Sequence, residues 1–231
     1  MHEKVKTFIF EDFNFDPQPG RLALRYSIDE KLNFEEVWNF PIVTLNQFTN
    51  NEGKLLPQIQ NALQGLWIMC GISYYKTYLP KNIVIKGDQL SKSQAEFFDK
   101  IYLHGLGEFF YENKFDPRGL VKFPFGEARE LESEEAREPF KLNGTMIAVG
   151  GGKDSLTTIE ILKQQLIEDQ KNKSLKDKKS FPLGKGWDGG ALSTWSVGHG
   201  ELFAPMLETI GLPHTEVKRK ICPNLLNLYK S

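Results

Sequence analysis

Short runs in which hydrophobic and polar residues alternate fill the first part of the chain. Aromatic and β-branched residues are concentrated in Val5–Phe10, Arg21–Ile28 and Glu35–Phe40, and turn-forming residues separate these runs. Alternation with a period of two is typical of strands that bury one face. We therefore predict a small antiparallel meander at the start of the chain.

Helical spacing then replaces this alternation. Apolar residues recur three and four positions apart in Leu55–Tyr78, where Pro57 suits the first turn of a helix. A second helix is predicted from about Ser91 or Ser93 to Asn113. With the meander, these helices make an α+β domain, which we place at residues 1–126. The side chains expected to point inward from the second helix are Phe97, Phe98, Ile101, Tyr102, Leu106, Phe109 and Phe110.

An acidic stretch follows this domain. Glu127–Glu138 carries six glutamates and little apolar surface, as solvated linkers and exposed helices do. Both composition and periodicity change across it. We therefore expect an acidic linker over residues 127–143 and a separate domain after it.

The pattern after the linker alternates between short apolar runs and helical periodicity. Thr145–Val149 and Ala191–Val197 suit buried parallel strands, and Glu216–Lys218 begins a third strand. Ser155–Asp169 and Glu201–Ile210 have the spacing of helices. A strand–helix–strand–helix–strand order is typical of an open parallel sheet with crossover helices.

This order predicts an α/β parallel-sheet domain over residues 144–231. Gln170–Ser180 is rich in lysine and nearly free of apolar residues, so we expect a mobile crossover there. Three short parallel strands make a thin sheet, and such sheets need helices on both faces. The sequence ends at Ser231, where a fourth unit would begin. We therefore expect this domain to be truncated, with a missing C-terminal segment or a partner supplying the rest.

Composition narrows the possible partners and the compartment. The 231 residues carry a formal net charge of -1, with 29 basic and 30 acidic residues, which does not provide the positive field that nucleic acid requires. No apolar run reaches the roughly 20 residues of a membrane helix. Cys70 and Cys222 are the only cysteines and indicate neither a disulfide framework nor a zinc site. We expect a cytoplasmic protein that binds neither nucleic acid nor membranes.

A glycine-rich hexamer, Gly150–Ser155, lies between the first predicted strand of the second domain and its helix. Free N–H groups and the positive end of the helix dipole favour an anion at such a junction. Consecutive glycines let the backbone approach phosphate oxygens closely, and the serine adds a hydroxyl donor. Gly151, Gly152, Asp154 and Ser155 fit the pyrophosphatase-loop (PP-loop) pattern Ser-Gly-Gly-x-Asp-Ser, and Gly150 stands in place of its serine. We predict that this loop binds ATP.

Other interpretations of the hexamer are weaker. A Walker A loop needs Ser or Thr after Gly-Lys, but Asp154 follows Lys153. The dinucleotide fingerprint needs a third glycine where Ser155 stands. A glycine-rich turn capped by Asp154 or Ser155, without a ligand, is the remaining alternative. Lys153 argues against it, because a lysine in a cradle of amides is better placed to meet a phosphate than to assist a turn.

Several segments, in the same order, resemble the MurL family of bacterial UDP-N-acetylmuramoyl-L-alanyl-L-glutamate epimerases. They are CGISYYKTYLP, IYLHGLGEFFYENKFDPRGLVKF, IAVGGGKDSLTTIEILK, SVGHGELF and ETIGLPHTEVKRKICPNLLNL. The resemblance implies a HUP-like PP-loop domain and an isomerase of peptidoglycan synthesis in cell wall biogenesis. It also implies that ATP and Mg²⁺ support inversion of the terminal L-glutamate of the UDP-linked dipeptide, with release of AMP and pyrophosphate.

The resemblance also implies roles for individual residues. Lys153 is the expected catalytic residue, because it would neutralise the charge that grows around the α-phosphorus. Asp154 is the expected metal ligand, orienting Mg²⁺ with the leaving pyrophosphate. Activation of the glutamate α-carboxylate as an acyl-adenylate would allow a base and an acid to exchange the α-proton. The residues expected to bind ATP are Gly150, Gly151, Gly152, Asp154, Ser155, Gly198 and His199.

The chain departs from the family pattern in three ways. Lys171–Lys185 looks like an insertion, and His199 stands where a small residue is expected. Family members also continue well past the length of this chain. We therefore expect this chain alone to bind ATP weakly and not to epimerise the substrate.

The sequence also contains weaker candidates for site residues, and it allows two alternative functions. His104 lies on a mostly apolar helix, where a histidine is more often a core residue than a ligand. Tyr74, Tyr75 and Lys76 end a helix and are as well explained by capping it. Arg219 and Lys220 follow a strand and would suit either a diphosphate or a solvated edge. The alternative functions are another PP-loop adenylating enzyme, for amidation or tRNA modification, and a degenerate ATP-binding module without turnover.

Overall fold

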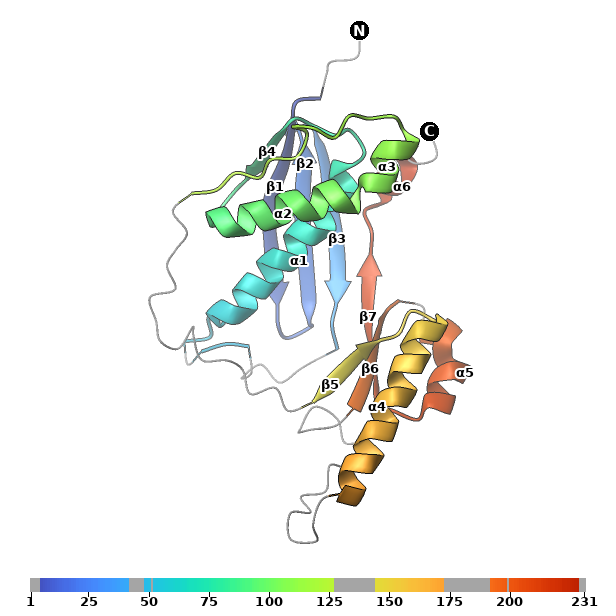
Figure 1. Ribbon diagram of the computed structural model, residues 1–231. Coiled ribbons are helices and arrows are strands. Elements are labelled where there is room, and N and C mark those ends of the chain that lie inside the picture. Colours follow the sequence, from blue (N-terminus) through green and yellow to red (C-terminus); the bar gives the residue numbers. More distant parts are fainter. Residues whose placement is uncertain are drawn as a thin grey trace. The chain divides into compact units, whose positions relative to one another are not determined.

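The computed structural model describes residues 5–41, 48–50, 52–126, 144–172, 192–198 and 200–228 (Figure 1). The chain divides into two compact units. Unit 1 comprises Met1–Trp38, Ile42–Glu138 and Lys220–Ser231, and unit 2 comprises Asn39–Pro41 and Pro139–Arg219. The acidic stretch and most of the lysine-rich stretch lie outside the described residues.

A mixed sheet forms the base of unit 1. Its strands, in the order β4-β1-β2-β3, are β4 (Asn82–Ile85), β1 (Thr7–Asp16), β2 (Arg21–Ile28) and β3 (Leu32–Asn39). β1 and β2 pair antiparallel, so the predicted antiparallel pairing is confirmed. β4 pairs parallel with β1 and was not predicted, because its run of three apolar residues carries too little periodicity to identify a strand.

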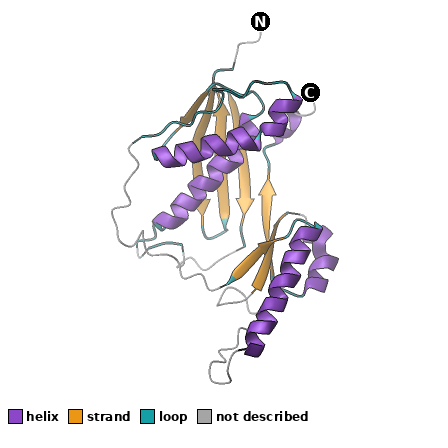
Figure 2. Ribbon diagram, in the orientation of Figure 1, coloured by secondary structure: helices purple, strands orange, loops and turns teal. Residues whose placement is uncertain are grey.

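Helices α1 (Pro57–Tyr75) and α2 (Lys92–Gly105) cover one face of this sheet, and the short helix α3 (Gly107–Glu112) follows them (Figure 2). The hydroxyl of Tyr26 on β2 donates to the carbonyl of Trp67 on α1 at 2.8 Å. Gly71 lets α1 approach β1, since a Cβ there would lie 2.5 Å from the ring of Phe10. Close backbone approach therefore requires this glycine.

The helix predicted over residues 91–113 is interrupted at Leu106, which separates α2 from α3. Gly105 and Gly107 flank the break, and glycine has a low helix propensity. Phe97 is also not inward as predicted, because its side chain is 55% exposed. Adjacent helical residues point about 100° apart, and Phe98 takes the inward position.

A buried carboxylate joins three segments of unit 1. Glu36 on β3 is fully buried, and its oxygens accept hydrogen bonds from Trp38 Nε1 at 2.6 Å and from the hydroxyl of Tyr74 at 2.8 Å. The backbone N–H of Cys222 donates to the same hydroxyl at 3.4 Å. Helix α6 (Pro223–Leu228) follows Cys222 and lies in unit 1, although the sequence analysis placed these residues in the second domain.

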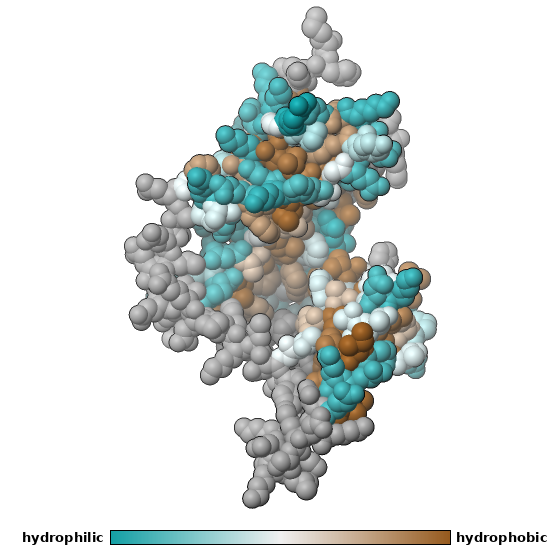
Figure 3. All heavy atoms as spheres, in the orientation of Figure 1, coloured by the Kyte–Doolittle hydropathy of each residue, from teal (hydrophilic) through white to brown (hydrophobic). Residues whose placement is uncertain are grey.

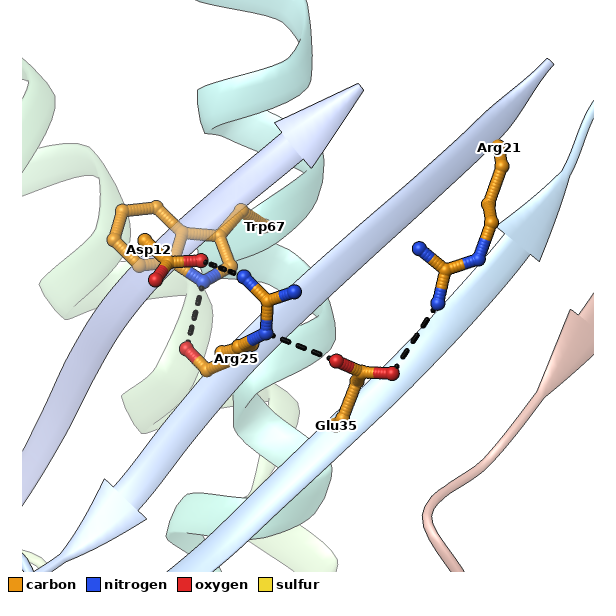
Figure 4. Close-up of polar contacts among 5 residues, drawn as sticks. All are labelled: Asp12, Arg21, Arg25, Glu35 and Trp67. Atoms are coloured by element: carbon orange, nitrogen blue, oxygen red, sulfur yellow. Dashed lines mark hydrogen bonds and ion pairs between the residues drawn. The ribbon is translucent and has the colours of Figure 1, made fainter. Parts of the chain in front are cut away.

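The opposite face of the unit 1 sheet carries paired charges (Figure 4). Arg25 contacts Asp12 on β1 at 2.6 Å and Glu35 on β3 at 2.9 Å. Arg21 contacts Glu35 at 3.3 Å. The ion pairs cross three strands and lie on a half-exposed surface, where each contributes little stability by itself.

Unit 2 contains the predicted parallel sheet. Its strands β5 (Thr145–Ala148), β6 (Leu192–Val197) and β7 (His214–Lys220) pair parallel in sequence order. Helices α4 (Lys153–Asn172) and α5 (Gly200–Ile210) connect them. Figure 3 shows hydrophobic as well as hydrophilic residues on the outer side of α4, where Ile161 and Ile167 are exposed. The core residues of this unit are Ile147, Val149, Ile159, Leu192, Ile210 and Leu212.

Candidate functional site

The Gly150–Ser155 loop connects β5 to α4 and lies on the surface of unit 2. The N–H of Val149 still bonds to the carbonyl of Trp195, at 2.8 Å, so the loop leaves the sheet immediately after this residue. Residues 150–154 are all exposed. The loop therefore has free surface on which a ligand can rest.

Two separate constraints require glycine at position 151. Its φ of +79° lies in the left-handed region, which side chains rarely adopt. A Cβ there would also lie 2.7 Å from the ring of Phe203 on α5. At Gly150 and Gly152, a Cβ would meet nothing within 4 Å, so these two glycines leave open space beside the loop.

Helix α4 begins at Lys153, directly after the glycines. Its twenty residues make it long enough to have a full macrodipole, whose positive end lies at the loop. The hydroxyl of Ser155 donates to the carbonyl of Gly152 at 2.9 Å, so it must rotate to donate to a ligand. Within the described part of the chain, neither Lys153 nor Asp154 forms an ion pair, and both side chains are exposed.

The strand register brings a second glycine turn to the same edge of the sheet. Ala148 on β5 pairs with Trp195 on β6, and Val197 pairs with Val217 on β7. The carboxyl ends of β5 and β6 therefore lie side by side next to Val217, where open α/β sheets bind ligands, and β7 continues to Lys220. Gly198, with φ of +63°, donates its N–H to the carbonyl of Val217 at 2.8 Å. His199, also predicted to contact ATP, lies outside the described residues.

The carboxylate of Glu216 lies close to this edge and was not singled out in the sequence. Its Oε1 accepts the N–H of Gly200, the first residue of α5, at 3.1 Å. A methyl group on Gly200 would lie 2.8 Å from this carboxylate. Glu216 therefore holds the start of α5 and, with it, the Gly198 turn. An acidic residue within a short strand gives no sequence signal for such a contact.

A histidine between two hydroxyls was also missed. His214 on β7 contacts the Thr194 hydroxyl through Nδ1 at 3.0 Å and the Ser196 hydroxyl through Nε2 at 3.1 Å. Both hydroxyl residues belong to β6 and are buried. Burial lowers the pKa of His214 from its ordinary value, and Glu216 opposes this shift. The alternation of polar residues on β6 was the available signal, but it also fits an exposed strand face.

The lesser candidates lie in different surroundings. The hydroxyls of Tyr74 and Tyr75 are bonded within unit 1, to Glu36 and to the carbonyl of Leu120. Lys76 is the C-cap residue of α1, as the capping interpretation predicted. His104 is exposed in the last turn of α2. None of these four residues belongs to unit 2, which contains the glycine loop.

Metal binding by the described residues would depend on few protein ligands. In these ranges, no group of three or more His, Cys, Asp or Glu side chains is placed to hold a metal ion. Asp154 is the carboxylate within the loop itself. No helix in the same ranges is both long and apolar enough to cross a membrane.

Comparison with known proteins shows which family the chain matches and how much of its relatives' length it covers. Residues 1–178 match the family described as the MurL N-terminal domain. The chain is 28% identical over 225 residues to the UDP-N-acetyl-alpha-D-muramoyl-L-alanyl-L-glutamate epimerase of Xanthomonas oryzae pv. oryzae. It is 25% identical over 232 residues to the protein of the same name from Salinispora tropica. Each alignment covers 97% of this chain and 43% of the relative, so the chain spans less than half the length of these relatives. No solved structure matches it.

Proposed function

The chain belongs to the MurL N-terminal domain family, and we propose that it forms part of an ATP-dependent epimerase of peptidoglycan precursors. The reaction would invert the terminal L-glutamate of UDP-N-acetylmuramoyl-L-alanyl-L-glutamate, the compound in the names of its relatives. One observation gives the strongest support to the proposed binding of ATP. The exposed glycine loop lies at the positive end of a twenty-residue helix, on the carboxyl edge of a parallel sheet.

The loop offers the groups that a triphosphate needs. Backbone N–H groups of a glycine loop and of the first turn of the helix after it bind phosphates in strand-to-helix loops, and residues 150–152 and the start of α4 would supply them here. Lys153 adds a mobile positive charge, and Asp154 would take part in holding Mg²⁺, which shields phosphate charge when bound. The Ser155 hydroxyl can turn from the carbonyl of Gly152 toward a phosphate oxygen. These residues fit the expected nucleotide, and no other described loop combines them.

ATP would remove a specific chemical obstacle to this epimerisation. Removing the α-proton of a free glutamate would place a carbanion beside a carboxylate, with two negative charges on neighbouring atoms. Adenylation of that carboxylate, with release of pyrophosphate, gives a carbonyl that can delocalise the charge. A base and an acid on opposite faces can then remove and return the proton, and hydrolysis releases AMP and the D-glutamyl product.

Lys153 is the residue whose removal tests the proposal best. A preorganised cation at the developing charge is typically worth about a hundredfold to a thousandfold in rate. Because we expect no epimerisation by this chain alone, the test uses the chain joined to the C-terminal part of a relative. In that protein Lys153→Met should reduce pyrophosphate release by that factor in the presence of ATP, Mg²⁺ and the UDP-linked L-glutamyl dipeptide. Lys92→Met, which changes an exposed lysine on α2, is the matched control and should retain the activity.

The same assay separates the alternatives. Pyrophosphate release that needs the UDP-linked dipeptide and yields D-glutamate after hydrolysis supports the epimerase. Release that needs a different acceptor indicates another PP-loop adenylating enzyme. ATP binding without release in any mixture indicates a nucleotide-binding module. If ATP does not bind and Lys153→Met changes nothing, the loop has no nucleotide function and the proposal is wrong.

A further inference from the structure

A second possible ligand site lies in unit 1, between the first halves of α1 and α2. The cavity has a volume of about 290 Å³. Asn61, Gln64 and Gly65 line it from α1, and Ser93, Gln94 and Phe97 line it from α2. Figure 1 shows the two helices diverging toward their N-termini on this side of the sheet. Leu90 and Phe98 complete the lining.

The chemical character of the lining is distinctive, because none of these eight side chains is charged. The larger concavity of unit 1, on the opposite face of the sheet, is lined by Asp12, Arg25, Glu35 and other charged residues that already pair with one another. The cavity is open to solvent, since half of its lining residues are exposed, and it offers a phosphate or a carboxylate no counter-ion. It favours a neutral ligand that forms hydrogen bonds.

Gly65 gives the strongest indication that something occupies the cavity. A glycine inside a helix costs about 0.5–1 kcal/mol relative to alanine, so a packing reason is expected for it. Gly71, in the same helix, has one, because a Cβ there would collide with Phe10. Gly65 has none, since nothing in the described structure lies within 4 Å of a Cβ at this position. Its missing side chain instead widens the cavity.

Phe97 and two amides supply the recognition groups. Phe97 is 55% exposed beside the cavity, in T-shaped contact with Phe98 at 5.3 Å, so one of its faces is available for stacking. Gln94 Oε1 accepts the N–H of Ser91 at 2.8 Å, and its Nε2 has no acceptor among the described residues. The amide of Asn61 likewise makes no hydrogen bond within the described ranges. These groups match a flat ring that carries carbonyl and N–H edges.

We propose that this cavity binds the uracil ring of a uridine nucleotide. The assignment rests on the proposed function for its biological ligand, because the substrate of that reaction carries a uridine diphosphate group. Uracil is uncharged and planar and has two carbonyl oxygens and one N–H. Its ring stacks on Phe97, and its edges bond to the amides of Asn61 and Gln94. Unit 1 thereby supplies the subsite for the nucleoside end of the substrate.

Binding of uridine to the full chain, measured by calorimetry or ligand-observed NMR, tests this assignment. Uridine is the suitable probe because it lacks the phosphate groups that the glycine loop would attract. Stacking of a base on an aromatic side chain is worth about 1–3 kcal/mol by alanine substitution, so Phe97→Ala should weaken binding by about five- to 150-fold. Tyr111→Ala removes another exposed aromatic side chain of unit 1 and should leave the affinity unchanged.

Gly65 provides an independent test. Gly65→Leu fills the cavity with a good helix former and should abolish uridine binding, and circular dichroism shows whether the variant is folded. Gly65→Ala should raise the thermal midpoint of unit 1, because it removes the cost of glycine in a helix. Equal uridine binding by wild type, Phe97→Ala and Gly65→Leu would overturn the assignment. No uridine binding, or binding of N-acetylglucosamine in its place, would do the same. If pyrophosphate release that needs the UDP-linked dipeptide is retained in those cases, the subsite fails while the proposed function stands.

Discussion

Phe203 on α5 lies against the α-carbon of Gly151, so closely that a methyl group at Gly151 would be 2.7 Å from its ring. The contact joins the glycine loop after β5 to the helix after β6 within unit 2. It means that the shape of the loop depends on a side chain from the next strand–helix connection. The Gly198 turn, which leads into α5, and the loop are therefore expected to move together.

Gly151→Ala should damage the loop more than substitution of its neighbours. Alanine at a φ of +79° costs roughly 1–2 kcal/mol, and its methyl group would displace Phe203 as well. We expect loss of most ATP binding and a lower free energy of unfolding for unit 2. Gly150→Ala adds a methyl group where nothing lies within 4 Å, and it should unfold like the wild type. Calorimetric ATP titration and urea unfolding of both variants check this, and equal stability of the two would contradict it.

Tyr74→Phe should destabilise unit 1. The change removes the 2.8 Å hydrogen bond to the fully buried Glu36 carboxylate and the acceptor of the Cys222 N–H. A hydrogen bond to a charged group contributes about 1.5–3 kcal/mol, and a buried group left without it costs at least as much. Urea unfolding should therefore show a loss of this size. Tyr78→Phe, at a half-exposed position, is the control, and a Tyr74→Phe loss no larger than that of the control would refute the role.

Alkaline pH should unfold unit 1. Burial raises the pKa of Tyr75 to about 12 and raises the pKa of Tyr26 and Tyr102 well above the ordinary value of 10.0. The unfolded chain then loses tyrosine protons at a lower pH than the folded protein, so stability is complete below about pH 10 and falls as the pH rises further. Tyrosinate absorbance should increase together with the loss of circular dichroism. Tyrosine ionisation in a protein that stays folded would contradict this expectation.

The alternation and spacing of apolar residues predicted most elements of the fold, because each of these elements buries one face. The antiparallel pairing of β1 with β2 and the strand–helix–strand order of unit 2 follow from such patterns. The break at Leu106 was missed because apolar spacing continues across it, while the flanking glycines end the helix. The return of residues 220–228 to unit 1 was not predictable, since it depends on the contact between Cys222 and Tyr74, which are far apart in the chain.

Of the candidate site, the sequence predicted the glycine loop and, through the family resemblance, Gly198, but not the side chains that reach this region from other elements. Gly150–Ser155 is a single run whose residue types explain its position between a strand and a helix. Phe203 and Glu216 reach the same region from other elements, and nothing in their neighbours distinguishes them from packing or surface residues. The strand register that brings them together arises from tertiary structure. The same limit applies to the open space beside Gly65, which only the packing of two helices shows.

Mild acid should loosen the sheet of unit 2 through His214. Both of its ring nitrogens contact hydroxyls of β6, and burial lowers its pKa below the ordinary 6.5. The unfolded chain therefore takes up this proton at a higher pH than the folded protein does. Its contribution to stability is complete above about pH 6.5 and is lost as the pH falls toward the folded pKa.

The groups around His214 define the measurement and its control. Glu216 favours the protonated ring, whereas the Thr194 and Ser196 hydroxyls contact it as hydrogen-bonding partners without charge. Hydrogen exchange of the β6 and β7 amides reports local opening, and it should accelerate between neutral and mildly acidic pH after correction for intrinsic rates. His214→Gln keeps polar atoms near both hydroxyls but cannot titrate, so the pH dependence should disappear. His104→Gln, at an exposed position on α2, should retain it. Identical pH dependence in wild type and His214→Gln would show that another group loosens the sheet.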